Sequence, residues 1–549
     1  MLKENIVRLI TLSIKNHWEV KAFSNYQGTS VNYGDVGNEL VRWHQLYNKL
    51  GIQDGDKIAL VGKNQINWAI VYLSTISYGA VIVPILPDFS AEDLHHIIDH
   101  SDARLLFAEE SILSSLQNEA FSSLEMVFSF QPSKEEISVH LNNSKIADDQ
   151  LKQFSRKKYK KISRDDFPEM DVRNDSLAVI NYTSGTTGFS KGVMLMHNSL
   201  SANITFARSA MSLEPGEQIV SFLPLAHAFG CAFDFLYPFT MGCHITFLTK
   251  IPSPQIVIKA FKELNPRLIF SVPLVIEKIY KNQILPKINS SILKLLIKFP
   301  LINRVIYGRI RKKIYEVFGG NFREMVIGGA ALNHEAEKFF KKMKLPFTIG
   351  YGMTECGPLI SYAPWEEHKL ESAGKIIDTL EIKIDSDDPY RVVGEILVRG
   401  ENIMSGYYKN KEATRQVIDD QGWLHTGDLG IIDREYNIFI KGRSKNMILG
   451  PSGQNIYPEE IESMINNLPC VNESLVIDRN HKLIALIYPE EDSLHEEELD
   501  MNKLETKMRQ NISELNDRLP GYMKIAGFEI LVNEFEKTPK KSIKRFIYK

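Results

Sequence analysis

Residues 182–192 have the sequence Tyr182-Thr183-Ser184-Gly185-Thr186-Thr187-Gly188-Phe189-Ser190-Lys191-Gly192, which combines glycines, small hydroxyl residues and one lysine. The glycines let the backbone adopt positive φ angles and approach a ligand closely, so that successive N–H groups can converge on phosphate oxygens. The hydroxyls add short donors, and Lys191 adds a positive charge. The apolar run at 177–180 predicts a strand that holds this loop on a rigid base. Together these residue types predict a strand-ended loop that wraps a polyphosphate.

This stretch has two other possible interpretations. A Walker loop needs a Gly-Lys pair, but Ser190 precedes Lys191, so the P-loop nucleotide hydrolases are excluded. A surface turn would have a similar composition, since clusters of glycine, serine and threonine usually form turns. The other motifs of the chain decide between a turn and a phosphate loop.

Length and composition indicate an ordinary globular protein. At 549 residues the chain is too long for a single hydrophobic core, so several packed units are expected. Its 44% hydrophobic and 24% charged residues are typical of globular proteins, and a net charge of -3 gives no general attraction to nucleic acid. The four cysteines lie far apart without metal-ligand spacing. We expect a cytoplasmic protein without a secretory signal.

Strands alternate with helices in the first part of the chain. Helices are expected at 6–14, 33–50, 68–78 and from residue 91, and strands at 57–61, 80–86 and 105–108. This alternation predicts parallel sheets covered by helices. Residues 68–87 carry no charge, but a glycine and two prolines interrupt them, which favours a buried helix followed by a strand over a membrane span.

Two basic segments bear on possible partners. Residues 156–161 contain five basic side chains but no accompanying aromatic platform or binding motif, so we interpret them as a solvated connector and expect no nucleic-acid partner. Residues 278–313 contain ten basic residues and no acidic one, interleaved with apolar side chains. This second segment has two interpretations: peripheral contact with an anionic membrane surface, at the inner membrane face, or a solvated helix pair packed on its own domain.

Further motifs follow in the second half of the chain. Residues 350–355 read Gly-Tyr-Gly-Met-Thr-Glu, where a small-residue bend next to Tyr351 predicts a flat slot for a purine. Beside a triphosphate, the Glu355 carboxylate would be a ligand for Mg²⁺, which takes few carboxylates together with phosphate oxygens. Asp428 lies in a glycine-flanked bend that suits ribose hydroxyls, although an ordinary Asx-turn has the same residues. His227, in an apolar segment, is on composition alone a core histidine.

The order of these segments closely resembles the adenylate-forming superfamily, which includes acyl-CoA synthetases, luciferases and the adenylation domains of peptide synthetases. The resemblance covers essentially the whole chain, and residues 452–460 are similar to the long-chain fatty-acid branch. It implies an α/β fold: a large N-terminal domain, 1–440, with two parallel-sheet αβ layers and a small β-barrel-like unit around 394–430. A hinge at 441–447 and a small mobile α+β C-terminal domain, 448–549, complete the implied fold.

The resemblance also implies a two-step reaction. A carboxylate attacks the α-phosphate of ATP to give acyl-AMP and pyrophosphate, and the thiol of coenzyme A then displaces AMP to form a thioester. The first step needs charge neutralisation and in-line positioning more than acid–base catalysis. The implied substrate is a fatty acid, and the implied cofactors are ATP, Mg²⁺ and coenzyme A as co-substrate.

Site roles are carried over position by position. The residues implied in binding ATP or AMP are Thr183, Ser184, Gly185, Thr186, Thr187, Gly188, Lys191, Gly329, Ala330, Ala331, Gly350, Tyr351, Gly352, Thr354, Asp428 and Arg443. Those implied in lining the acyl pocket are His227, Phe229 and Gly230, where Gly230 is expected to leave open space. Mg²⁺ is expected on Thr186 and Glu355, the hinge and the coenzyme A step on Lys445 and Gly453, and direct catalytic roles on His227, Thr186, Glu355 and Lys541.

The sequence departs from the family where the adenylation lysine is expected near the C-terminus, because Ser542 stands there. In an extended segment Lys540 and Lys544 share the face of Ser542, whereas Lys541 points the other way. A one-residue slip would bring Lys541 in, and we hypothesise that Lys541 substitutes. Three functions remain open: a long-chain fatty acid–CoA ligase, an acyl-AMP ligase that delivers to an acyl carrier protein, and a catalytically degenerate protein that binds acyl chain and nucleotide.

Overall fold

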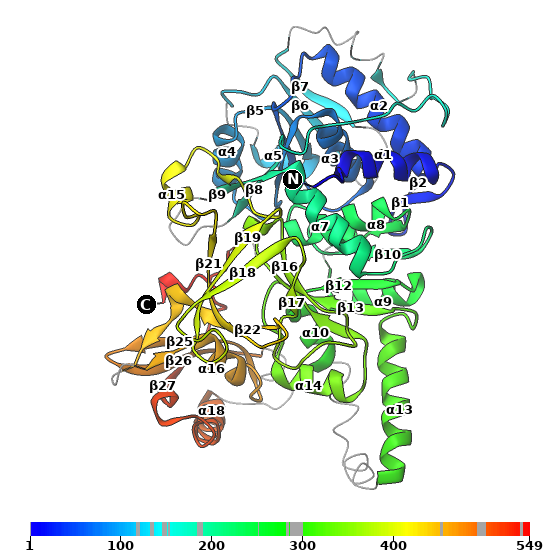
Figure 1. The fold of residues 1–549 in the computed structure, drawn as a ribbon. Coiled ribbons are helices and arrows are strands. Elements are labelled where there is room, and N and C mark those ends of the chain that lie inside the picture. The colour runs from blue at the N-terminus through cyan, green and yellow to red at the C-terminus, as the bar shows by residue number, and fades with distance from the viewer. Residues whose placement is uncertain are drawn as a thin grey trace.

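The computed structural model describes residues 2–116, 121–131, 137–144, 151, 154–156, 158–183, 190–250, 252–281, 285, 300–450, 454–490, 501–538 and 542–548. These residues form the α/β fold that the sequence predicted, with parallel strand pairs spread over four sheets (Figure 1). None of the helices in the described ranges is both long enough and apolar enough to cross a membrane.

An eight-stranded sheet carries the glycine-rich loop. Its strand order is β20-β9-β8-β4-β3-β5-β6-β7, with a parallel centre from β8 to β6 and antiparallel strands on both sides. Its strands are β3 (Lys57–Val61), β4 (Val81–Ile85), β5 (Ala103–Glu109), β6 (Met126–Phe130), β7 (Ser138–Asn142), β8 (Leu177–Thr183), β9 (Lys191–Met196) and β20 (Gly406–Tyr407). The predicted strands at 57–61, 80–86 and 105–108 are thus confirmed.

The charge-free stretch is a buried helix and strand, as predicted. All residues of helix α3 (Ile66–Tyr78) except the last are buried, and so is every residue of β4. Gly79 ends the helix with a φ of +99°, a conformation that glycine adopts without strain. The other helices of this part are α2 (Tyr33–Lys49), α4 (Ala91–His100) and α5 (Glu110–Leu116).

Two further sheets of the larger part contain parallel strands, and a third parallel pair outside the eight-stranded sheet joins Lys482–Pro489 to Ile525–Ile530 near the C-terminus. One has the order β10-β11-β1-β2, and the other, β12-β13-β14, is wholly parallel. Their strands are β1 (Lys21–Asn25), β2 (Ser30–Asn32), β10 (Gln218–Ser221), β11 (His244–Phe247), β12 (Leu268–Ser271), β13 (Glu324–Ile327) and β14 (Phe347–Ile349). The helices of this part are α1 (Ile6–Asn16), α7 (His197–Ala210), α8 (Tyr237–Thr240), α9 (Pro254–Leu264), α10 (Pro273–Ile279), α13 (Pro300–Val317) and α14 (His334–Lys342).

The strand-rich region predicted at 394–430 lies in an antiparallel sheet of four strands, with the order β18-β19-β21-β22. Its strands are β18 (Leu380–Asp385), β19 (Gly394–Gly400), β21 (Leu424–Ile432) and β22 (Ile438–Arg443), and helix α15 (Lys411–Arg415) lies between β20 and β21 in the chain. A smaller antiparallel sheet is formed by β15 (Tyr351–Gly352), β16 (Leu359–Tyr362) and β17 (Lys375–Ile376).

The last hundred or so residues have a hydrophobic cluster of their own, which includes Ile461, Leu504 and Met508. Figure 1 shows these elements gathered below the larger sheets, in orange and red. They are β23 (Ile448–Leu449), β24 (Asn455–Ile456), α16 (Pro458–Ile465), β25 (Val471–Arg479), β26 (Lys482–Pro489), α18 (Met501–Asn516) and β27 (Ile525–Ile530). Lys281 reaches them from the larger part: its ammonium donates to the Asn466 carbonyl at 2.9 Å and lies 3.6 Å from the Glu490 carboxylate.

A buried carboxyl fastens β13 to the chain that follows β16. Glu324 is 6% exposed, and it accepts hydrogen bonds from the Tyr362 hydroxyl at 2.6 Å and the Trp365 amide at 2.7 Å. Burial raises the pKa of Glu324 to about 7 against these two hydrogen bonds. The folded protein therefore holds this proton at pH values where the unfolded chain has released it.

We predict that Glu324→Gln stabilises the protein only at higher pH. The favourable contribution of wild-type Glu324 is fully present below its unfolded pKa and is lost as the pH rises through about 7, because the fold must then bury a charge. Between pH 5 and 8 the unfolding free energy of the variant should gain on the order of 3 kcal/mol over the wild type. Denaturant titrations of both proteins between pH 5 and 8 measure this difference in unfolding free energy. The exposed Glu412→Gln is the control, and a pH-independent difference for Glu324→Gln would contradict the assignment.

Candidate active site

The ends of the glycine-rich loop are fixed by a strand pair. Thr183 and Lys191 face each other at the end of the antiparallel ladder between β8 and β9, and the Thr183 hydroxyl donates to the Lys191 carbonyl at 3.4 Å. Residues 184–189 lie outside the described residues, and with them the predicted phosphate ligands Ser184, Gly185, Thr186, Thr187 and Gly188. The described flanks place Lys191 at the base of this loop.

Glu355 is brought next to Lys191 by a tyrosine from a distant part of the chain. The Tyr407 hydroxyl donates to Glu355 Oε1 at 2.9 Å, and the Lys191 ammonium lies 4.9 Å from the centre of the Tyr407 ring. Tyr407 belongs to β20, which pairs with β9. The predicted phosphate-binding lysine and the predicted metal ligand therefore share one side chain as a neighbour.

Glycine is required in the turn that presents Glu355. Gly350 connects β14 to β15, and its N–H donates to the Ile327 carbonyl at 2.9 Å. A Cβ on Gly352 would lie 2.2 Å from the Pro358 carbonyl oxygen, so no larger residue fits there. Thr354 and Glu355 follow in a short 3₁₀ turn, where both are half-buried.

Tyr351, Asp428 and Arg443 form a second cluster. The Tyr351 hydroxyl donates to Asp428 Oδ2 at 2.7 Å, and Arg443 Nε lies 2.9 Å from Asp428 Oδ1. Asp428 and Arg443 are direct partners across β21 and β22, and Asp428 is 4% exposed. Burial raises the pKa of Asp428, and the charge of Glu355 adds to that rise, against the opposite effects of Arg443 and Tyr351.

The turn 351–355 connects the two clusters, because Tyr351 at its start contacts Asp428 and Glu355 at its end contacts Tyr407. Residues from the eight-stranded sheet, the β15–β16 turn and the four-stranded antiparallel sheet thus meet in one place.

The His227 segment is tied to the same strand as the glycine-rich loop. Asn181 of β8 donates to the Ala226 carbonyl at 3.0 Å, and the His227 amide donates to the Pro224 carbonyl at 3.0 Å. The Phe229 ring packs on Gly328, where an added Cβ would lie 3.2 Å from Phe229 Cζ. His227 and Phe229 are both half-buried.

The expectation that Gly230 leaves open space beside the acyl pocket is wrong. A Cβ on Gly230 would lie 2.5 Å from the Pro224 carbonyl oxygen, so this glycine permits a close backbone approach and leaves no room for a ligand. Gly230 begins a π-helical turn, Gly230–Leu236, whose Asp234 accepts hydrogen bonds from the Phe222 and Leu223 amides at 3.2 and 3.1 Å. This turn holds the His227 segment in place.

Gly329, Ala330 and Ala331 follow β13 and are exposed, and Gly329 has a φ of +92°. They lie where the parallel strands β12, β13 and β14 end, which is where open α/β sheets bind ligands. Their role in a purine slot stays a prediction.

Lys445 is exposed in the 3₁₀ turn Ser444–Asn446 between β22 and β23, two residues after Arg443. Asn446 of the same turn donates to Glu459 at 2.7 Å, so the predicted hinge segment, 441–447, contacts α16. Gly453 and Lys541 lie outside the described residues.

The premise that the chain is extended through Ser542 is wrong. The Thr538 amide donates to the Ser542 carbonyl at 2.8 Å, the Ser542 amide donates to the Thr538 hydroxyl at 3.3 Å, and Lys537 and Ile543 pair as antiparallel neighbours. The chain therefore reverses direction here, so strand alternation does not decide which lysine faces the site. Lys544 lies 3.7 Å from Glu536.

The oxygen donor of Glu355 fits Mg²⁺. Within the described ranges no three His, Cys, Asp or Glu side chains are grouped to hold a metal ion. Mg²⁺ commonly takes one or two carboxylates and completes its shell with phosphate oxygens and water. A half-buried carboxylate beside the phosphate-loop strand is therefore a sufficient protein ligand when a triphosphate supplies the rest.

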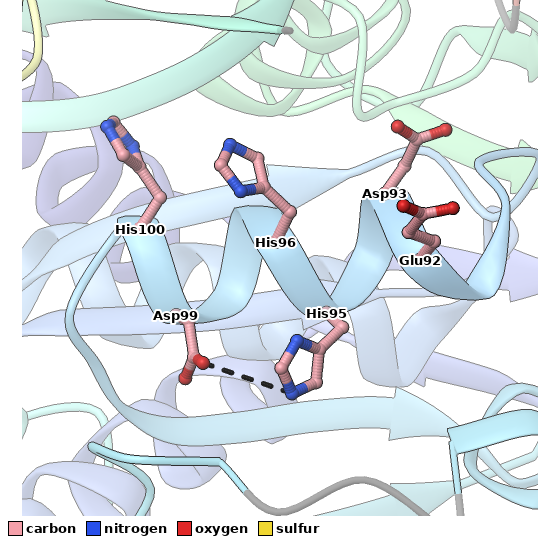
Figure 2. A pocket seen from close by; sticks show the side chains of 6 residues that line it. All are labelled: Glu92, Asp93, His95, His96, Asp99 and His100. Atoms are coloured by element: carbon pink, nitrogen blue, oxygen red, sulfur yellow. Dashed lines mark ion pairs between the residues drawn. The ribbon is translucent and has the colours of Figure 1, made fainter.

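A hollow of about 450 Å³ lies along α4, outside the predicted site (Figure 2). It is lined by Glu92, Asp93, His95, His96, Asp99 and His100. Figure 2 shows the 3.9 Å ion pair of His95 with Asp99 on the other side of the helix from His96 and His100. His100 Nδ1 lies 2.7 Å from the Tyr182 hydroxyl, so α4 helps to fix the end of β8.

Sequence reasoning missed Tyr407 and Asp234. Asp234 had a usable signal, because a single carboxylate within the apolar run 231–239 is rarely buried without a structural task. Tyr407 follows a glycine in an otherwise polar stretch, and nothing local indicates that its partners lie near residues 191 and 355.

Comparison with known proteins identifies the family of this chain. A family model described as an AMP-binding enzyme matches residues 13–408, and one described as an AMP-binding enzyme C-terminal domain matches residues 445–548. The chain is 28% identical to long-chain-fatty-acid–CoA ligase heimdall of Drosophila melanogaster over 512 residues, which is 86% of this chain and 73% of that protein. It is also 28% identical to long-chain-fatty-acid–CoA ligase FadD15 of Mycobacterium bovis over 480 residues, 82% of this chain and 75% of that protein.

Solved structures show the same fold at lower identity. The anthranilate CoA ligase AuaEII in complex with anthranoyl-AMP has a TM-score of 0.79 and 19% identity, covering 100% of this chain and 97% of that chain. ATP-bound MatB from Rhodopseudomonas palustris has a TM-score of 0.76 and 20% identity, covering 99% of this chain and 98% of that chain. The resemblance indicated by the motifs is confirmed, and since one family model alone matches well over half of its length, the chain belongs to the AMP-binding enzyme family.

Proposed function

We propose that this protein is an ATP-dependent fatty acid–CoA ligase that activates a long-chain carboxylic acid as acyl-AMP and then forms acyl-CoA. The observation that supports it most is the meeting of Lys191, Glu355 and Asp428, which come from three different sheets or turns. The names of the relatives heimdall and FadD15 support the long-chain substrate.

In the first step an oxygen of the fatty acid carboxylate attacks the α-phosphorus of ATP. The bond from that phosphorus to the bridging oxygen breaks, and pyrophosphate leaves with the electron pair. Lys191 and the loop residues Thr183, Ser184, Gly185, Thr186, Thr187 and Gly188 bind the phosphates. Glu355 and Thr186 would hold Mg²⁺, which supplies charge neutralisation at the phosphates when it is bound.

The adenosine half is bound by the second cluster in this proposal. Gly329, Ala330, Ala331, Gly350, Tyr351 and Gly352 border the base, Thr354 lies beside the phosphates, and Asp428 with Arg443 binds the ribose. Asp428 is an acceptor for ribose hydroxyls because its buried carboxylate already accepts from Tyr351 and Arg443, which fix its orientation. His227 and Phe229 line the carboxylate end of the acyl pocket.

In the second step the sulfur of coenzyme A attacks the acyl carbonyl carbon, AMP leaves, and the thiol proton is released. We place the hinge for this step at 441–447, between the domains 1–440 and 448–549. Two observations support it: the separate hydrophobic cluster of the C-terminal elements, and the exposed 3₁₀ turn that carries Lys445. Gly453 belongs to the coenzyme A step in this proposal.

The proposed function predicts acid-dependent pyrophosphate release that rises with chain length from acetate to palmitate. With radiolabelled palmitate and ATP, we expect acyl-AMP without coenzyme A and acyl-CoA with it. Acyl-AMP that coenzyme A does not consume would indicate an acyl-AMP ligase that delivers to a carrier protein. Calorimetric ATP binding without any acyl-AMP would indicate a degenerate binding protein.

For the missing adenylation lysine, we predict that Lys541→Ala lowers pyrophosphate release by about 100-fold, as expected for loss of a charged group that stabilises the transition state. Thioester formation from supplied acyl-AMP should remain close to the wild type. Lys540→Ala and Lys544→Ala are the matched controls and should release pyrophosphate normally. Normal release by all three variants would show that no single one of these lysines is needed.

We also propose peripheral membrane contact through residues 278–313. The described part of this segment has exposed basic side chains at Arg309, Arg311, Lys312 and Lys313 on α13. A substrate with a long alkyl tail is found in the bilayer. A basic surface that binds the membrane would bring the enzyme to this substrate.

Replacing these four α13 residues by serine should weaken binding to vesicles of anionic lipid by about 100-fold or more, because each basic side chain near such a surface contributes about 1 kcal/mol. Cosedimentation with anionic and neutral vesicles measures this. The control replaces the exposed Lys503, Arg509, Arg518 and Lys524, which changes the net charge equally. Equal binding of the wild type to both kinds of vesicle would contradict the proposal.

A further inference from the structure

Residues 401–408 join the two motifs that the proposed function assigns to the triphosphate. On one side, the Ser405 amide donates to the Met194 carbonyl at 3.0 Å and the Tyr408 amide donates to the Gly192 carbonyl at 2.7 Å, both on β9. On the other side, the Met404 amide donates to the Glu355 carbonyl at 2.8 Å. The backbone of this segment thus fixes the distance between β9 and the Glu355 turn.

The Tyr407 side chain completes this connection. It is 7% exposed, its hydroxyl donates to Glu355 Oε1 at 2.9 Å, and its ring face lies under the Lys191 ammonium at 4.9 Å. A phenol hydroxyl is protonated at neutral pH, and a carboxylate can only accept, so Tyr407 is the donor in this hydrogen bond. Tyr407 therefore contacts the Lys191 ammonium through its ring face and the Glu355 carboxylate through its hydroxyl.

This arrangement keeps two opposite charges close without letting them neutralise each other. Both Lys191 and Glu355 are described, and no ion pair joins them directly. The ring attracts the ammonium through its negative face, and the hydroxyl uses one oxygen of the carboxylate. Each charge thus stays available for a ligand that carries both phosphate oxygens and a divalent cation.

We propose that Tyr407 is a positioning residue for Mg²⁺-ATP. It holds Glu355 for the metal through its hydroxyl and Lys191 for the phosphates through its ring. The inference rests on the proposed function for its ligand, and it adds a residue whose hydroxyl and ring have separable tasks.

Titration calorimetry of ATP binding, with Mg²⁺ and with EDTA, tests this inference without requiring turnover. Tyr407→Phe keeps the ring and loses the hydroxyl, so its ATP affinity should fall by about tenfold with Mg²⁺, the equivalent of one hydrogen bond to a charged group, and should change little in EDTA. Tyr407→Leu also loses the ring and should weaken binding several-fold in EDTA.

Tyr408→Phe is the matched control. Its hydroxyl makes the same kind of bond, to Asp102 Oδ2 at 2.8 Å, but on the exposed side of the chain. This variant should bind ATP like the wild type in both conditions, and melting temperatures confirm that all variants are folded.

The inference is overturned if Tyr407→Phe binds Mg²⁺-ATP like the wild type, or if it loses affinity equally with and without Mg²⁺. It is also overturned if Mg²⁺ does not increase the ATP affinity of the wild type. If the wild type binds Mg²⁺-ATP but releases no pyrophosphate with any acid, the proposed ligase activity fails while the binding result for Tyr407 stands.

Discussion

The buried carboxylate of Asp428 is the contact on which the proposed nucleotide site depends. It accepts a hydrogen bond from Tyr351 of the purine slot and pairs with Arg443, the last residue of β22. If Tyr351 or Arg443 moved away, the buried Asp428 carboxylate would lose part of its compensation, which costs free energy. The Asp428 contacts therefore restrain both β15 and β22. The Asp428 side chain therefore positions both the predicted purine slot and the start of the predicted hinge at 441–447. A ribose bound at Asp428 would compete for the oxygens that orient Arg443.

Much of the fold could be predicted from the sequence because the patterns are local. The strand at 57–61 and the helix that starts at residue 91 have clear apolar periodicity, and Ser90 caps that helix by accepting from the Asp93 amide. The glycine and prolines within residues 68–87 correctly separated a buried helix and strand from a membrane span. The strand-rich region was predicted as a small barrel-like unit, and its strands form the antiparallel sheet β18-β19-β21-β22.

The errors and omissions at the site have long-range causes. Gly230 was assigned to an open pocket, but its neighbour is the Pro224 carbonyl, which only the folded turn brings near. Tyr407 was missed because its two partners lie more than fifty residues away in sequence. The alternation argument at Ser542 assumed an extended chain, whereas the hydrogen bonds with Thr538 reverse it. The pairing of Tyr351 with Asp428 also depends on contacts that no local pattern contains.

The contact of Lys281 with the C-terminal elements has an energetic consequence. The ammonium donates to the Asn466 carbonyl and lies near Glu490, and all of these groups are partly exposed to water. Such surface ion pairs contribute roughly 0–1 kcal/mol, close to thermal energy. Lys281 therefore favours the observed contact between the larger part and the C-terminal elements only weakly. Breaking this contact would add almost nothing to the free-energy barrier of the proposed hinge motion.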